Sequence, residues 1–254
     1  MAVKPSSTLA ITAKAKELKA QGVDVVGFGA GEPDFPTPQR IKDAAFKAIN
    51  ENKTTYTPAS GLLDLKKAVC NRMKKDLDLD YEPSQVVVTS GAKHVLYTVL
   101  MVLCEQGDEV IIGAPYWVSY SEMVKQTGGT AVLCEAGEEQ NFKITAESLE
   151  ACITERSKVF MLNSPSNPTG MVYSKEELAA IAEVCCKHNL YVIADEIYAN
   201  LVYDDLKFYS LAQFGEDIKN RTIIVNGVSK SYAMTGWRIG YAIANKEIAK
   251  VMGN

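Results

Sequence analysis

The sequence predicts an α/β fold, with a mostly parallel seven-stranded sheet covered by helices on both faces. Two observations carry this prediction: apolar runs rich in Val and Ile recur along the chain, and stretches with helical spacing separate them. The runs are continuously apolar rather than alternating, which is typical of strands buried on both faces of a parallel sheet. The expected strands are 85–89, 109–113, 130–135, 158–162, 190–194, 222–226 and 239–244.

Only the last of these strands, 239–244, is expected to run antiparallel to its neighbours. The chain reaches it from a turn around Lys230, and this connection is too short for a helical crossover. Between the earlier strands, helices are expected in 92–106, 118–129 and 175–189.

Residues 1–38 differ from the rest and are expected to form an N-terminal arm and a small-domain fragment. The stretch 4–22 opens with Pro-Ser-Ser-Thr and has helical spacing, which predicts a capped helix. A Gly- and Pro-rich loop follows at 27–38, and a second helix is expected over 38–52. The large domain is expected to cover 39–254.

The last residues, 247–254, predict the beginning of a helix with no closing element after it. We therefore expect the C-terminal small domain to be absent from this sequence. We also expect the last helix to lack a packing partner, which would leave apolar surface exposed.

The composition argues against several classes of protein. A net charge of −4 gives no basic footprint for nucleic acid. No apolar run reaches membrane-spanning length, and MAVKPSST contains no signal-peptide core, so we expect a cytoplasmic protein without membrane partners. The six cysteines form no C-x-x-C pair and the two histidines are far apart, so we expect reduced thiols and no metal site. Neither a P-loop nor a G-x-S-x-G motif occurs.

The chemistry-bearing residues follow the ends of the expected strands. Ligands of parallel α/β sheets bind at the carboxyl ends of the strands, so these residues are expected to share one rim. Each alone has an ordinary structural explanation, such as a turn, a core aromatic or a solvated charge. Together they offer an anion site, an aromatic ring, an amide, a carboxylate, a phenol and an amine: Ser90–Lys93, Trp117, Asn167, Asp195, Tyr198 and Ser229–Lys230.

Pyridoxal 5′-phosphate is a ligand that uses all six groups. Its phosphate needs amides and an arginine, and its ring needs an aromatic face. Its ring nitrogen needs a buried carboxylate, and its aldehyde needs a lysine with a lowered pKa. The sequence therefore predicts that Lys230 forms a Schiff base with this cofactor and that Arg238 clamps its phosphate.

The segment GVSKSYAMTGWRIG (227–240) resembles the lysine-site signature of class I aminotransferases. The other motifs resemble those of bacterial-type aspartate and aspartate/prephenate aminotransferases: AGEPDFPTP (30–38), PYWVSY (115–120), NSPSNPTG (163–170) and DEIY (195–198). The resemblance covers essentially the whole chain. It implies the large domain of a fold-type-I pyridoxal-phosphate transferase, with amino-acid and 2-oxo-acid substrates.

The resemblance also implies a role for each site residue. It makes Lys230, Asp195 and Tyr198 catalytic, with Asp195 on the ring nitrogen. It assigns the phosphate, ring and O3′ contacts as follows: Gly91, Ala92, Lys93, Ser229 and Arg238 to the phosphate, Trp117 to the ring face, and Asn167 and Tyr198 to O3′. Tyr56 would reach the phosphate of a neighbouring subunit, so a homodimer is implied.

The implied substrate contacts are Gly31, Trp117 and Asn167, with Lys4 and Thr8 of KPSST recognising a dicarboxylic substrate. Two features depart from the family pattern: Gly227 stands where some relatives have a serine, and no residue matches the arginine that binds the substrate α-carboxylate. The chain as given is therefore expected to have little turnover. Two alternatives stay open: a truncated, non-catalytic cofactor-binding domain, and another reaction of the same cofactor such as carbon–sulfur β-lysis.

Overall fold

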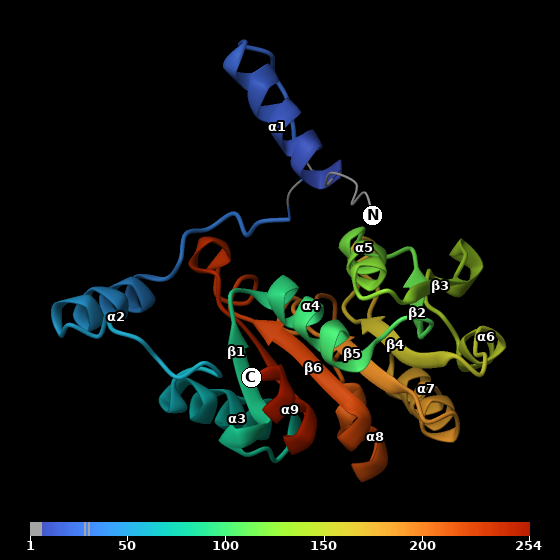
Figure 1. The fold of residues 1–254 in the computed structure, drawn as a ribbon. Coiled ribbons are helices and arrows are strands. Elements are labelled where there is room, and N and C mark those ends of the chain that lie inside the picture. The colour runs from blue at the N-terminus through green and yellow to red at the C-terminus, as the bar shows by residue number, and fades with distance from the viewer. Residues whose placement is uncertain (1–6, 28, 30) are drawn as a thin grey trace.

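The computed structural model describes residues 7–27, 29 and 31–254. Its centre is a seven-stranded sheet in the order β1-β7-β6-β5-β4-β2-β3 (Figure 1). β7 pairs antiparallel with both β1 and β6, and the other pairs are parallel. The predicted antiparallel last strand is therefore confirmed. The strands are β1 (Val86–Thr89), β2 (Glu109–Ala114), β3 (Thr130–Glu135), β4 (Ser157–Asn163), β5 (Tyr191–Asp195), β6 (Thr222–Gly227) and β7 (Gly240–Ile243).

Helices cover both faces of the sheet, as the sequence predicts. The described α-helices are α1 (Ser7–Ala20), α2 (Gln39–Asn50), α3 (Leu63–Leu77), α4 (Ala92–Leu103), α5 (Ser119–Gln126), α6 (Ala146–Ala151), α7 (Lys175–Lys187), α8 (Glu216–Arg221) and α9 (Lys246–Met252). Helices α4, α5 and α9 pack with Ile193 and Val225 on one face. Helices α6, α7 and α8 pack with Val192 on the other, and α3 packs beside them with Ile224. Successive strand residues thus serve opposite faces, as the pleat requires.

The last helix contradicts one expectation. α9 buries Ile248, Ala249 and Met252 in the same apolar cluster as α4, so it does have a packing partner. Its first turn is capped, because the Asn245 side chain accepts a hydrogen bond from the Ile248 N–H at 2.9 Å. The expectation of an unpacked last helix was therefore wrong. The reason is that α4 supplies the facing surface.

Helices α1 and α2 extend away from the sheet on a long connection (Figure 1). α2 buries none of its residues, and large apolar side chains on and near it are exposed, among them Phe35, Phe46 and Ile49. The predicted cap of the first helix lies outside the described residues. The division into an arm (1–38) and a large domain (39–254) stays a prediction. Among the described residues, no helix is both long and apolar enough to cross a membrane.

Gly240 lets β7 approach the first turn of α4. A Cβ at this position would overlap the Ala92 nitrogen and the Gly91 carbonyl carbon, which are backbone atoms that cannot turn aside. We expect Gly240→Ala to lower the free energy of unfolding by about 1–3 kcal/mol, as overpacking does in other cores. Chemical denaturation measures this. Gly236→Ala is the control, because no atom lies within 4 Å of the added Cβ. Equal stability of the two variants would contradict the prediction.

Candidate active site

A pocket of about 690 Å³ lies at the carboxyl ends of β4, β5 and β6. The structure brings most of the predicted site residues together there. Those that line the pocket are Gly31, Ala92, Lys93, Trp117, Asn167, Asp195, Tyr198, Ser229, Lys230 and Arg238. The convergence follows from the parallel strands, whose ends meet at one edge of the sheet.

The first turn of α4 and Arg238 form a cationic corner of this pocket. Gly91 has φ of +91°, and any Cβ there would overlap the Arg238 guanidinium. A side chain at this position would therefore fill the space between the helix and the arginine. The first N–H groups of a helix have no partner inside it, and the helix dipole adds positive potential. The corner consequently fits a phosphate group, with a guanidinium and backbone amides as donors.

Asp195 lies buried on the floor of the pocket, at the end of β5. Its Oδ2 accepts a hydrogen bond from the Tyr120 hydroxyl at 2.7 Å, and its Oδ1 accepts one from the Ile197 N–H at 3.2 Å. Burial raises the pKa of Asp195 to about 6, and these two hydrogen bonds oppose that rise. No cation of the described residues pairs with Asp195, and such a buried carboxyl fits a cofactor that brings a protonated ring nitrogen to this position.

Tyr120 and Asn163 are site residues to which the sequence analysis gave no role. The Tyr120 ring packs edge-on against Trp117, with the centroids 5.5 Å apart. The signal was present, because Tyr120 follows Trp117 by almost one helical turn in PYWVSY. Asn163 ends β4 and links two predicted residues: its Nδ2 donates to the Asp195 carbonyl at 2.8 Å, and its Oδ1 accepts from the Asn167 N–H at 2.7 Å.

Lys230 reaches across the pocket from the turn after β6. Its Nζ donates a hydrogen bond to the Gly31 carbonyl oxygen and lies 5.9 Å from the centroid of the Tyr198 ring. Burial lowers the pKa of Lys230; Glu32 opposes this change and Arg238 adds to it. A lowered pKa increases the fraction of neutral amine, which is the nucleophilic form.

Tyr198 and Asn167 form a second polar pair. Both line the pocket. Burial raises the pKa of the Tyr198 hydroxyl, the Asp195 charge adds to this rise and the Asn167 side chain opposes it. The phenol therefore stays protonated at neutral pH and can donate a hydrogen bond. On the wall nearby, the Lys93 ammonium lies 4.8 Å from the Trp117 ring centroid, a cation–π distance.

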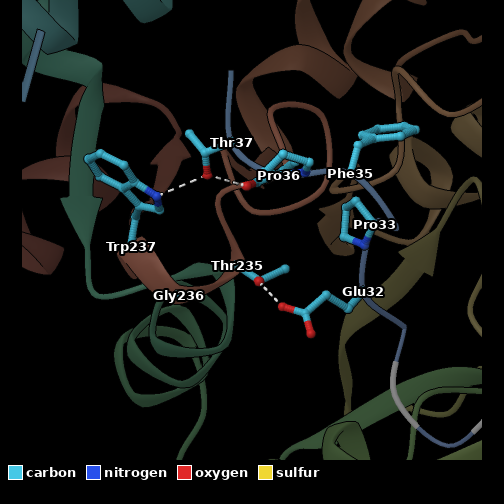
Figure 2. A pocket seen from close by; sticks show the side chains of 9 residues that line it. Glu32, Pro33, Phe35, Pro36, Thr37, Thr235, Gly236 and Trp237 are labelled. Carbon is cyan, nitrogen blue, oxygen red and sulfur yellow. Dashed lines mark hydrogen bonds between the residues drawn. The ribbon is translucent and has the colours of Figure 1, made fainter. Parts of the chain in front are cut away.

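Residues 31–37 form a segment, which we call the strap, that is hydrogen-bonded to the turn between Lys230 and Arg238. Figure 2 shows its contacts: Thr37 donates to the Ala233 carbonyl at 2.5 Å and accepts from the Trp237 indole N–H at 3.1 Å. Further along, Thr235 donates to the Glu32 carboxylate. Residues of the strap and of the turn together line a second pocket of about 440 Å³.

Some predicted residues lie elsewhere. Tyr56 follows α2; its side chain is fully exposed and does not line the pocket. Lys4 lies outside the described residues, and Thr8 lies in α1 with its side chain outside them. At Gly227, a Cβ would lie 2.8 Å from the Ile239 carbonyl oxygen, so the glycine lets β6 and β7 approach each other closely.

This sheet order and the superposition on solved aspartate aminotransferases identify the fold as that of the fold-type-I pyridoxal-phosphate transferases. The chain belongs to the aminotransferase class I and II family, whose sequence profile matches residues 23–254.

Curated relatives and solved structures agree with this assignment. The chain is 55% identical to an aspartate aminotransferase of Bacillus sp. (strain YM-2) over 98% of its length, and 54% identical to that of Bacillus subtilis over all of it. It is 48% identical to a probable aspartate/prephenate aminotransferase of Aquifex aeolicus. The fold superposes on the aspartate aminotransferase of Thermus thermophilus with maleate at a TM-score of 0.95, with 43% identity over 99% of the chain. The chain spans 63–64% of the length of these curated relatives and 65% of that structure.

Proposed function

We propose that this chain is the cofactor-binding part of a pyridoxal-phosphate-dependent aminotransferase for dicarboxylic amino acids such as aspartate or glutamate. The single observation that carries the proposal is the meeting of Lys230, Asp195 and the Arg238 corner in one pocket. The names of the relatives support the reaction. The Thermus structure supports the substrate class, because maleate is a four-carbon dicarboxylate.

The residues of the pocket fit each part of pyridoxal 5′-phosphate. The Gly91–Lys93 amides, Ser229 and Arg238 would hold its phosphate, and Trp117 would stack on its ring. Asn167 and Tyr198 would bind O3′, and Asp195 would pair with the ring nitrogen. When bound, this cofactor supplies an aldehyde for the Lys230 amine and an electron sink for the bonds at the substrate Cα.

Two residues then act on protons. Asp195, buried and oriented by Tyr120 and Ile197, holds a proton on the ring nitrogen by presenting its carboxylate to it. The lowered pKa leaves more of the Lys230 amine neutral at neutral pH. Its Nζ would take the proton from the substrate Cα as a base and, once protonated, would give it to C4′ of the cofactor as an acid. Tyr198 donates its hydroxyl proton in a hydrogen bond to O3′.

Substrate binding requires a grip on the α-carboxylate, and the described residues supply one arginine to the pocket. Arg238 is committed to the phosphate. Three others form ion pairs elsewhere, with Asp76, Glu109 and Asp217, and Arg40 lies on α2. Gly31, Trp117 and Asn167 would contribute further substrate contacts, with Lys4 and Thr8 recognising the distal carboxylate.

Partners and location remain part of the proposal. The exposed Tyr56, together with the apolar side chains exposed on α2, supports a homodimer in which Tyr56 reaches the neighbouring site. The acidic charge of the sequence argues against nucleic-acid partners. A cytoplasmic location is part of the same proposal.

The test compares the 254-residue chain with a chimaera in which it is followed by the C-terminal residues of the Bacillus subtilis relative. We expect both to bind pyridoxal 5′-phosphate, seen as visible absorbance. We expect the chimaera to transfer the amino group of aspartate to 2-oxoglutarate, and the chain alone to be slower by at least about 100-fold, because orientation of the substrate carries much of the rate. A chain that binds no cofactor would refute the proposed function. Equal rates of the chain and the chimaera would show that binding of the substrate α-carboxylate needs no further arginine.

The strap provides a second test. We expect Thr37→Val to weaken cofactor binding up to about tenfold, because the variant loses two hydrogen bonds worth about 1 kcal/mol each that fix the turn between Lys230 and Arg238. A cofactor titration followed by absorbance measures this. Thr37→Ser keeps the hydroxyl and should bind as the parent does. Equal affinity in Thr37→Val would show that the strap does not position the site.

A further inference from the structure

Glu196 is a buried carboxyl directly after Asp195, on the opposite side of the sheet. Asp195 bonds to Tyr120, which packs in the cluster of α4 and α5. Glu196 instead bonds to Ser210, which precedes the 3₁₀ helix η3 (Leu211–Gln213). Successive side chains along a strand point to opposite faces, so the two carboxyl groups lie on either side of the strand end that forms the pocket floor.

The described residues place no cation at the Glu196 carboxyl. Its side chain is buried, and its Oε1 accepts a hydrogen bond from the fully buried Ser210 hydroxyl at 2.6 Å. Among the described residues, no lysine, arginine or histidine pairs with it. A buried carboxylate without a cation is costly, and a carboxyl group avoids this cost by staying protonated.

Glu196 also begins a chain of hydrogen bonds that links the end of β5 to η3 and to the end of α3. The Ser210 N–H donates to the Gln213 side chain at 3.0 Å, and the Gln213 Nε2 donates to the Leu77 carbonyl at the end of α3 at 2.8 Å. The Tyr81 hydroxyl lies on this side as well. It is the one buried side-chain polar atom in the described chain without a hydrogen-bond partner.

Resting on the proposed function, we propose that Glu196 is a positioning residue kept as the neutral acid. As the neutral acid, Glu196 links the end of β5 to Ser210. It also places no second negative charge next to Asp195, which faces the cofactor nitrogen. Ionisation of Glu196 in alkaline solution would place two adjacent carboxylates at the end of β5. Their repulsion would weaken the link between β5 and Ser210, so Asp195 would no longer be held in position as the pH rises.

The direction of the shift in the Glu196 pKa agrees with a neutral acid. Burial raises the pKa of Glu196 to about 8, the Ser210 hydrogen bond opposes this rise, and the Asp195 charge adds to it. The other titratable groups on this side include Tyr81, Tyr241, Tyr232, Glu216, Asp76, Lys219 and Arg72. Burial raises the pKa values of Tyr81 and Tyr241. Lys219 lies over the Tyr81 ring and Arg72 pairs with Asp76, so neither cation pairs with the Glu196 carboxyl.

The raised pKa translates into a pH dependence of stability. The neutral form is favoured in the folded state, so its contribution is complete below the ordinary value of 4.5 and is lost as the pH rises through about 8. Asp195 acts in the same direction through about pH 6. The difference between the parent and a Glu196 variant isolates the part that belongs to Glu196.

The first experiment needs no cofactor. We measure the denaturant midpoint of the chain from pH 5 to 9 in the parent, in Glu196→Gln, and in Glu183→Gln, which removes an exposed glutamate of α7. The midpoint of the parent and of Glu183→Gln should fall from pH 5 to about 8, and that of Glu196→Gln should fall less over this range. The infrared C=O band of a protonated carboxyl, present at pH 7 and lost above 8, should be missing in Glu196→Gln. Identical pH profiles, or a parent without this band at pH 7, would overturn the neutral acid. The infrared band of the parent shows whether a carboxyl group is protonated at pH 7 even if Glu196→Gln does not fold.

The second experiment measures the absorbance of bound cofactor against pH. The parent should lose the cofactor or change its spectrum above pH 8, and Glu196→Gln should not. Glu196→Ala, which cannot bond to Ser210, should bind cofactor more weakly than Glu196→Gln at pH 7. If the parent and Glu196→Gln lose cofactor alike above pH 8, the positioning role is overturned. A parent that binds no cofactor at any pH refutes the proposed function, while the first experiment still decides the protonation of Glu196.

Discussion

Borohydride reduction of the cofactor-loaded chain is expected to leave a pyridoxyl group on Lys230, found by peptide mass mapping. The reason is geometric and electrostatic. The Lys230 Nζ lies in the pocket opposite Asp195, hydrogen-bonded to Gly31, and burial lowers its pKa toward the range in which the neutral amine is available. Replacing Lys230 by alanine should abolish the label and reduce turnover of the chimaera by at least about a thousandfold, because both the covalent attachment and the proton carrier are lost.

Lys93 is the matched control, since it is the other lysine that lines the pocket. Burial and Arg238 lower its pKa as well, but its ammonium faces the Trp117 ring. In Lys93→Ala the label should still be found on Lys230. A label on Lys93 in the parent chain, or a persistent label in Lys230→Ala, would show that the assignment is wrong.

Replacing Asp195 by asparagine should reduce turnover on the order of 10²–10³-fold while most of the cofactor affinity remains. The amide fits the same space but carries no negative charge, so it cannot keep the ring nitrogen protonated. Cofactor affinity depends more on the phosphate corner, where Gly91 and Arg238 lie against each other.

Turnover of Asp195→Asn is measured in the chimaera and cofactor affinity in the chain, each by absorbance. Asp217→Asn on α8 is the control, because Asp217 forms an exposed pair with Arg221 away from the pocket and should leave both values close to the parent's. Near-normal turnover in Asp195→Asn would mean that another group pairs with the ring nitrogen. A parallel loss of affinity and turnover would mean that Asp195 mainly holds the fold.

The elements that the sequence predicted best are those with a strong local signal. All seven strands lie within a few residues of their predicted positions, because continuous Val/Ile runs are characteristic of a buried parallel sheet. The antiparallel β7 followed from connection length alone. Three helices without such a signal were missed: α3, α6 and α8. Two of them have six residues each, and the charged α3 buries only Val69, Cys70 and Met73.

The site was predictable as a set of residues because parallel strands bring their carboxyl ends to one rim. The sequence could not give the contacts that orient this set. Tyr120 bonds to Asp195 across 75 positions of the chain, and Thr37 bonds to Ala233 across 196. Sequence spacing contains no information about which side chains meet over such separations.

The sequence by itself determined the positions of the strands along the chain, the direction of the last strand, the family and ten of the residues that line the pocket. Each of these depends on local pattern, on connection length or on motifs read residue by residue. Only the tertiary structure decided the ionisation of the neighbouring carboxyl groups in DEIY. Asp195 faces Tyr120 and the pocket, whereas Glu196 faces Ser210 and pairs with no cation of the described residues. Burial raises the pKa of Asp195 to about 6 and that of Glu196 to about 8. A carboxyl group's pKa depends on its desolvation and its neighbours, and packing sets both.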